Sequence, residues 1–74
     1  MKVVPGKYTH YKGGQYEVIG IARHSETLED YVAYKALYNS KKFGSNALWI
    51  RPLSMFIDEV QIDGKMVHRF VPEI

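Results

Sequence analysis

The histidines His10, His24 and His68 are the residues of this chain best suited to hold a metal ion. Imidazole ligands from all of them, completed by a water molecule, would make a catalytic zinc site. Such sites usually have ligands at a short and regular spacing, and these histidines are far apart in the chain. Cysteine is absent, which excludes thiolate ligands and disulfides. We therefore expect no metal and no cofactor, and we expect surface or hydrogen-bonded histidines.

The segment His24-Ser25-Glu26 places a base, a nucleophile and a carboxylate in consecutive positions. The partners of a catalytic triad come from separate elements, because neighbours in the chain rarely reach the required geometry. A hairpin turn in which Ser25 and Thr27 bond the backbone explains the same residues. We therefore predict no catalytic residue in this cluster.

Arg51 stands between an apolar segment and Pro52, where a strand end could present its guanidinium at a rim. The fork of donors on a guanidinium suits a carboxylate or a phosphate. The alternative is an ion pair with Glu17, Glu26 or Glu59 that stabilises the fold and binds no ligand.

Aromatic residues are abundant: the chain has six tyrosines, three phenylalanines and one tryptophan, Trp49. So small a domain cannot bury all of them, and rings left at the surface can receive extended peptides or stacked bases. The alternatives are rings at a homodimer interface, or tyrosines at the edge of the core whose hydroxyls are exposed to solvent. The predicted ligand-binding residues are Arg51, Trp49, His24, His10, Tyr11, Lys12 and Tyr34.

Length and composition describe one small domain over residues 1–74. The formal net charge of +2 is too small to indicate nucleic-acid binding by itself. No apolar run approaches the roughly 20 residues of a membrane helix, and the first residues lack the apolar core of a signal peptide. We expect a cytoplasmic protein.

Alternating apolar and polar residues predict a mostly β fold with tight turns at Gly13-Gly14 and Asp63-Gly64. Gly20 indicates a bulge, with Ile19 and Ile21 on one face of their strand. The expected strands cover 7–11, 16–23, 31–38, 48–51, 59–63 and 66–71, with a helical turn over 52–56 and a loop over 39–46. The segment 27–38 also has helical spacing, and periodicity alone leaves both readings open.

The chain resembles a bacterial family known as a domain of unknown function, number one-six-five-three. The matching segments are His10 to Gly14, Tyr16 to Val18, Ala22 to Thr27, Val32, Tyr34, Leu37-Tyr38, Leu48 to Leu53, Met55-Phe56, Val60, Asp63-Gly64 and Arg69-Phe70. The resemblance implies a small SH3-like antiparallel β-barrel with 31–38 as a strand. It implies no activity, and the fold does not supply one.

These observations favour a non-catalytic binding module for an extended or anionic ligand, which would be a peptide, a nucleotide or a nucleic acid. One alternative is a small enzyme or enzyme-associated domain with His10, His24, Glu26 and Arg51 in one cleft. Another is a structural domain that forms homodimers or docks a partner. We expect no contact with a membrane.

Overall fold

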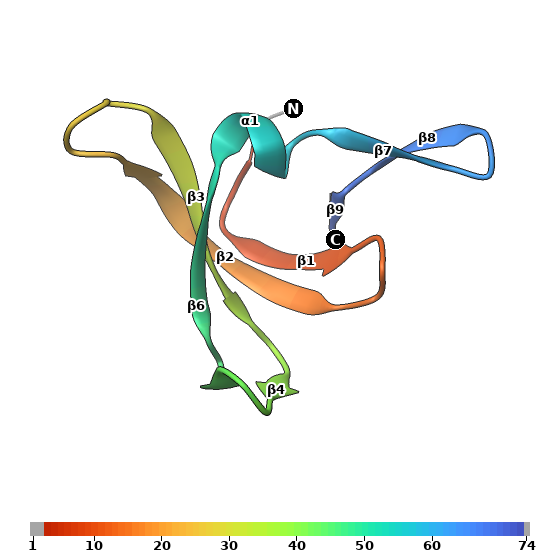
Figure 1. Cartoon of the computed structure of the whole chain (residues 1–74), viewed down its shortest axis with the longest axis horizontal. Helices are drawn as coiled ribbons and strands as arrows, with labels where there is room; N and C mark the ends of the chain where they lie inside the picture. The colour runs from red at the N-terminus through yellow and green to blue at the C-terminus, as the bar shows by residue number, and fades with distance from the viewer. Residues whose placement is uncertain (1–2, 74) are drawn as a thin grey trace.

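Short β-strands make up most of the chain in the computed structural model, which describes residues 3–73 (Figure 1). The main sheet contains β1 (Gly6–His10), β2 (Gln15–Arg23), β3 (Asp30–Ala36), β6 (Leu48–Pro52) and β9 (Phe70–Pro72). Two hairpins join β4 (Asn39–Ser40) to β5 (Gly44–Ser45) and β7 (Glu59–Ile62) to β8 (Lys65–His68), and α1 (Leu53–Phe56) is a single helical turn. The predictions of a mostly β fold and of a short helical turn after the Trp49 strand are confirmed.

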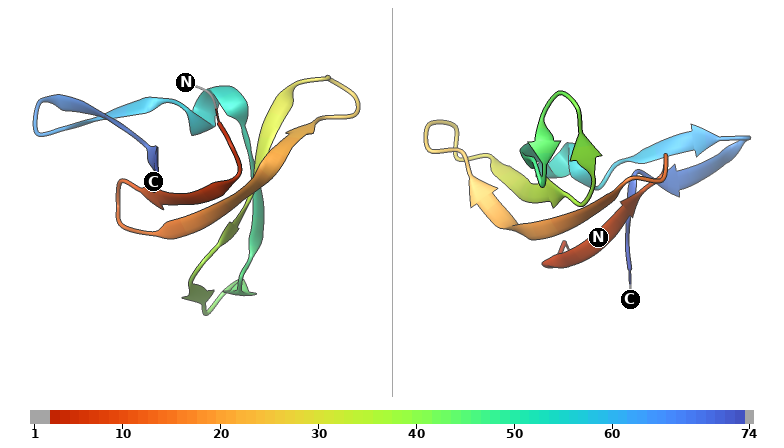
Figure 2. Two further views of the ribbon diagram at one scale, coloured as in Figure 1. Left: turned by 180° about the vertical axis from the view of Figure 1, so that it is seen from behind. Right: turned by 90° about the horizontal axis from the view of Figure 1, so that it is seen from below.

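The main sheet is antiparallel, has the order β6-β3-β2-β1-β9, and is strongly bent (Figures 1 and 2). Its two edges, β6 and β9, do not pair with each other, so the closed barrel expected from the sequence is not confirmed. The chain leaves β6 at Pro52, which has no amide proton for a further ladder bond. It then turns through α1 and the β7–β8 hairpin before it returns as β9.

The β2–β3 pairing contains the bulge predicted at Gly20, because the register shifts between Val18 and Gly20. After the shift Ile21 lies opposite the buried Val32, and residues directly opposite each other share a face. Ile21 is therefore on the core face, while Ile19 lines an outer hollow with Ala33. The expectation that the two isoleucines share a face was wrong, since the extra residue of the bulge reverses the alternation.

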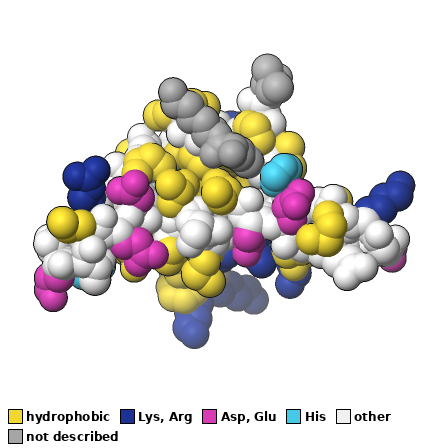
Figure 3. Space-filling model, turned by 90° about the horizontal axis from the view of Figure 1, so that it is seen from above, with side chains coloured by type: hydrophobic (Ala, Val, Ile, Leu, Met, Phe, Trp, Pro, Cys, Tyr) yellow, Lys and Arg dark blue, Asp and Glu magenta, His cyan; other side chains and the backbone are white. Residues whose placement is uncertain are grey.

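The core is a group of interlocked rings and β-branched side chains inside the bend of the sheet, made of Tyr8, Val18, Val32, Tyr34, Phe56 and Phe70. Phe56 comes from α1, has no exposed surface, and stacks on Phe70 with the ring centroids 4.2 Å apart. Seen from above, a group of hydrophobic side chains gathers near the middle of the molecule (Figure 3). The helical turn thus covers the open side of the sheet.

Residues 27–38, for which the sequence allowed either a helix or a strand, form a turn followed by β3. The amide of His24 donates to the carbonyl of Glu29, and the amide of Leu28 donates to the carbonyl of His24. Leu28 has a positive φ of 64°, which is incompatible with a helix at that point. The strand alternative was therefore correct.

Two segments differ from the elements expected from the sequence. The expected loop over 39–46 contains the small β4–β5 hairpin, whose turn is held by Ser40 Oγ accepting from the amides of Lys42 and Phe43. The expected single strand over 66–71 is divided at Arg69, whose amide donates to the Asp58 carbonyl at 3.1 Å. This bond turns the chain out of the β7–β8 hairpin and into β9. The only helix among residues 3–73 is far too short to span a bilayer.

Candidate functional site

An aromatic hollow of about 190 Å³ opens on the concave side of the sheet. Tyr34 lies opposite Trp49 in the β3–β6 ladder, and Arg51 follows two residues after Trp49, so all of them share one face. The hollow is lined by Tyr16, Tyr34, Tyr38, Trp49 and Arg51. The structure therefore brings together three residues selected from the sequence, Tyr34, Trp49 and Arg51.

Arg51 has no carboxylate partner among the described residues. Of the carboxylates considered as partners, Glu17 pairs with Lys35 at 3.5 Å, Glu59 lies 4.0 Å from His68 Nε2, and Glu26 belongs to the β2–β3 turn. The guanidinium carbon instead lies 5.5 Å from the centroid of the Phe70 ring. A guanidinium placed over a ring does not use its N–H donors in that contact, so they remain available to a carboxylate or phosphate.

The tyrosines of the hollow support one another. The hydroxyls of Tyr16 and Tyr38 are 2.8 Å apart, and the rings of Tyr16 and Tyr34 meet edge to face at 5.4 Å. Burial, followed by the hydrogen bond to Tyr38, raises the pKa of Tyr16 well above its ordinary value. The lining of the hollow therefore presents aromatic rings and one cation, and it contains no carboxylate.

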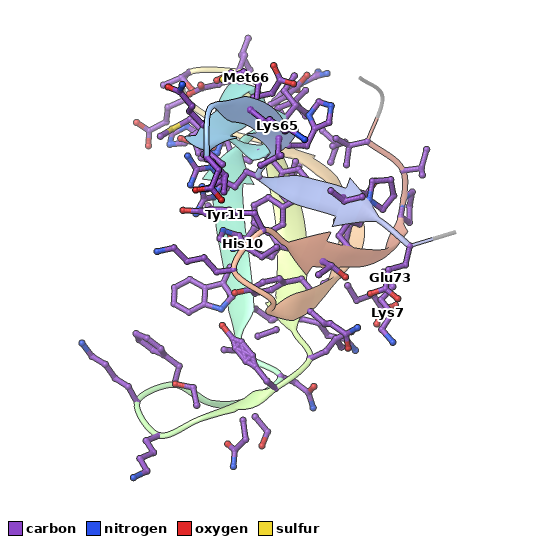
Figure 4. All side chains as sticks on the ribbon, turned by 90° about the vertical axis from the view of Figure 1, so that its right-hand side faces the viewer. Lys7, His10, Tyr11, Lys65, Met66 and Glu73 are labelled. Atoms are coloured by element: carbon purple, nitrogen blue, oxygen red, sulfur yellow. The ribbon has the colours of Figure 1, made fainter. Side chains whose placement is uncertain are left out.

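His10 extends this surface toward the β1–β2 turn, where its ring contacts Phe70 at 4.9 Å and Tyr11 at 4.6 Å (Figure 4). Burial lowers the pKa of His10, and the charges of Arg69, Arg51 and Lys12 lower it further. His10 is thus an uncharged ring at neutral pH in a neighbourhood of cations.

Tyr11 carries two cations over its ring, with Lys12 Nζ at 5.7 Å and the Arg69 guanidinium carbon at 5.9 Å from the centroid. Arg69 also holds Asp58 through two bonds of 2.7 and 3.3 Å. The hydrogen bond from Arg69 lowers the pKa of Asp58, which therefore stays ionised and paired. Lys12 and Arg51 remain as cations without such a partner among residues 3–73.

His24 does not join this group. Its Nδ1 accepts hydrogen bonds from the amides of Glu26 at 3.2 Å and Thr27 at 3.3 Å, so it organises the β2–β3 turn. That turn and the β1–β2 turn after His10 lie at opposite ends of the sheet (Figures 1 and 2). The separation excludes the single cleft that would combine His24 and Glu26 with His10 and Arg51.

No metal centre is formed by the histidines and carboxylates of the described region, residues 3–73. His68 belongs to the β7–β8 hairpin and faces Glu59. A second, larger hollow of about 580 Å³ separates that hairpin from β1 and β9. Its lining is Thr9, His10, Tyr11, Gly13, Ile62, Val67, His68 and Val71, which offers apolar contact and no fixed charge.

Several residues that build the aromatic hollow were not among the predicted site residues. Tyr16 could have been found, because strand alternation places it on the same face as Val18, which lies opposite Tyr34. Tyr38 lies beyond the end of β3 and lines the hollow through its hydroxyl and edge-to-face ring contacts with Tyr16. Phe70 and Arg69 come from the far end of the chain, and no local pattern connects them to Arg51.

Fold and site together define a class: a small, mostly β domain whose bent sheet presents an aromatic hollow with one arginine. The chain belongs to a family described as a protein of unknown function, DUF1653, whose model matches residues 6–72.

The crystal structure of a DUF1653 protein from Bordetella bronchiseptica is similar over 97% of this chain and 88% of that chain. The sequence identity is 32% and the TM-score is 0.85. No curated protein matches the chain. The resemblance seen in the sequence is thereby confirmed.

Proposed function

We propose that this chain is a non-catalytic binding module that receives an anionic group on Arg51 and a flat or apolar group among the surrounding rings. The observation that carries the proposal is a guanidinium in a ring-lined hollow without a carboxylate partner among the described residues. In a structural role, an arginine in such a place would be paired with a carboxylate. Arg69 is such a paired arginine, because its Nε lies 2.7 Å from Oδ1 of Asp58.

The charge of Arg51 also decides against a cationic ligand. A cage of Tyr16, Tyr34, Tyr38 and Trp49 alone would suit a methylated ammonium group through cation–π contacts. Arg51 in the same hollow opposes a second positive charge at this short range. An anion beside an aromatic or apolar group therefore fits the site best.

A second candidate is a docking or self-association surface on the outer face of the sheet. Leu48 is 72% exposed, Ile50 is 63% exposed and Ile19 is 54% exposed. They line a hollow of about 260 Å³ together with Ala33, Tyr34 and Trp49. Light scattering over a range of protein concentrations distinguishes this role, because a stable monomer contradicts self-association through this face.

The strand order and the short helix before the last strand of the main sheet support a partly open SH3-like barrel, which we retain as a proposal. The bacterial source and the cytoplasmic location stay predictions from the sequence.

The test is an amide-shift titration of the ¹⁵N-labelled chain with inorganic phosphate, a nucleoside monophosphate, short oligonucleotides and short acidic peptides. A matched pair of variants is Arg51→Gln and Arg23→Gln. Arg23 is exposed and pairs with Asp30 at the far hairpin, so it controls for the loss of one charge.

We expect a contiguous set of shifts that includes Trp49 and Arg51. A charge-assisted hydrogen bond is worth about 1.5–3 kcal/mol, so Arg51→Gln should weaken binding about tenfold to a hundredfold. Arg23→Gln should change it little. If no ligand shifts a patch containing Trp49 or Arg51, the proposal is wrong.

A further inference from the structure

The aromatic hollow continues on one side into the β4–β5 hairpin. The rings of Phe43 and Trp49 meet edge to face with their centroids 4.9 Å apart, and Lys42 Nζ lies 5.5 Å from the Phe43 centroid. Phe43 is 53% exposed, so one face of its ring is open to a ligand. A cation and a ring therefore stand next to Trp49 on a hairpin that projects from the sheet (Figure 1).

On the other side of the hollow a series of ring and cation contacts leads from Arg51 to the β1–β2 turn. Arg51 lies over Phe70, the Phe70 ring contacts His10, and His10 contacts Tyr11. Lys12 follows with its ammonium over Tyr11. We call the whole series the ring–cation row; it consists of Lys42, Phe43, Trp49, Arg51, Phe70, His10, Tyr11 and Lys12. Phe70 is only 1% exposed, so it connects Arg51 to His10 from within the core and offers no face to a ligand.

The row carries little opposing charge. The Asp58 carboxylate interacts electrostatically with Arg51, but it is already paired with Arg69 at 2.7 Å. Glu17 belongs to the outer face of the sheet, because it follows the inward-facing Tyr16 and pairs with Lys35. The net charge of the chain is only +2, so it is the placement of the cations, and not their number, that makes this face positive.

We propose that the ligand of the ring–cation row is a single-stranded nucleic acid, an inference that rests on the proposed function of the aromatic hollow. Phosphates contact Lys42, Arg51 and Lys12, and unpaired bases stack on the open rings of the row. A surface on which exposed rings lie between spaced cations suits a strand that carries both phosphates and flat bases. A duplex hides its base faces inside the stack, and an acidic peptide has no regularly repeated flat ring.

Binding is measured by anisotropy of a labelled thymidine oligonucleotide of about ten nucleotides and by fluorescence of Trp49, the one tryptophan of the chain. The competing probes are thymidine monophosphate, a blunt duplex of the same length and an acidic peptide. Variants Lys12→Ala and Lys42→Ala remove one phosphate contact each. Lys7→Ala is the control, because Lys7 is exposed on the other face of β1, beside Glu73 in Figure 4.

The oligonucleotide is expected to bind more tightly than the monophosphate and the duplex and to quench Trp49. Each neutralised phosphate contributes about 0.7 to the slope of log affinity against log salt, so three contacts give a slope of about −2. Lys12→Ala and Lys42→Ala each reduce that slope by about 0.7, and Lys7→Ala leaves it unchanged. Phe43→Ala removes one stacking ring and weakens oligonucleotide binding about fivefold to a hundredfold.

The outcomes separate the two proposals. If the monophosphate or the acidic peptide shifts Trp49 and Arg51 but the oligonucleotide binds no more tightly, the nucleic-acid inference is wrong and the binding-module proposal stands. If the duplex binds as well as the single strand, or Lys7→Ala has the effect of Lys12→Ala, the ring–cation row is also refuted. If no probe perturbs Trp49 or Arg51, both proposals fail.

Discussion

Phe56 offers the sharpest test of how this small sheet is stabilised. The ring comes from the single turn of α1 and is completely buried. It stacks on Phe70 at 4.2 Å and meets Tyr8 and Tyr34 edge to face at 5.6 and 5.5 Å. Phe56→Ala would therefore empty the centre of the core and remove the contacts that attach α1 to the sheet.

The expected loss is large relative to the stability of the domain. Replacing a fully buried phenylalanine by alanine costs about 3–5 kcal/mol. A chain of this length typically has a total free energy of unfolding of about 4–11 kcal/mol. A loss of that size lowers the melting temperature by at least about 12 °C, and it leaves a weakly stable wild type largely unfolded.

The assay is urea denaturation followed by circular dichroism, with Met55→Ala as the matched control. Met55 precedes Phe56 in the same helical turn and is 53% exposed, so its truncation should change the free energy of unfolding by less than about 0.5 kcal/mol. If both variants lose the same amount, α1 does not cover the sheet as described, and the role given to Phe56 is wrong.

Other predictions concern protonation and turns. The pKa of His10 is lowered below the ordinary 6.5, so the unfolded chain binds the proton more readily. The free energy of unfolding therefore falls as the pH drops below that value, and His10→Gln removes this part of the dependence in urea titrations at several pH values. Gly64→Ala should destabilise the fold by about 1–2 kcal/mol, because φ at Gly64 is +78°, whereas Gly20→Ala, which meets no atom within 4 Å, should cost less in the same denaturation assay. In a spectrophotometric alkaline titration Tyr38→Phe should lower the raised pKa of Tyr16, because it removes a hydrogen bond to the Tyr16 hydroxyl; an unchanged titration would contradict their contact.

Much of the fold could be predicted because its determinants are local. The turn at Asp63-Gly64 has positive φ at both residues, as its sequence indicates, and Gly20 marks the bulge. The bend of the sheet around its core could not be predicted in the same way. It depends on Phe56 and Phe70 meeting across the core and on the bond from the Arg69 amide to Asp58, which are long-range contacts without a local pattern.

The sequence predicted the grouping of Trp49 and Arg51 in the candidate site, but it did not predict which histidine joins them. Trp49 and Arg51 are two residues apart on a strand, so a shared face followed from the strand itself. His24 was selected for its chemistry, but its imidazole is used by the backbone of its own turn. The approach of His10 to Arg51 required the β1–β9 pairing, in which His10 lies opposite Phe70.

The central claim is that the Arg51 guanidinium is the anion receptor, and its own Nε–H resonance reports on this directly. In a titration of the ¹⁵N-labelled chain with thymidine monophosphate, we expect a saturable shift of that resonance, in step with the Trp49 indole signal. The Arg23 and Arg69 Nε–H resonances serve as internal references. A ligand that saturates the Trp49 signal and leaves the Arg51 Nε–H unmoved would contradict the claim.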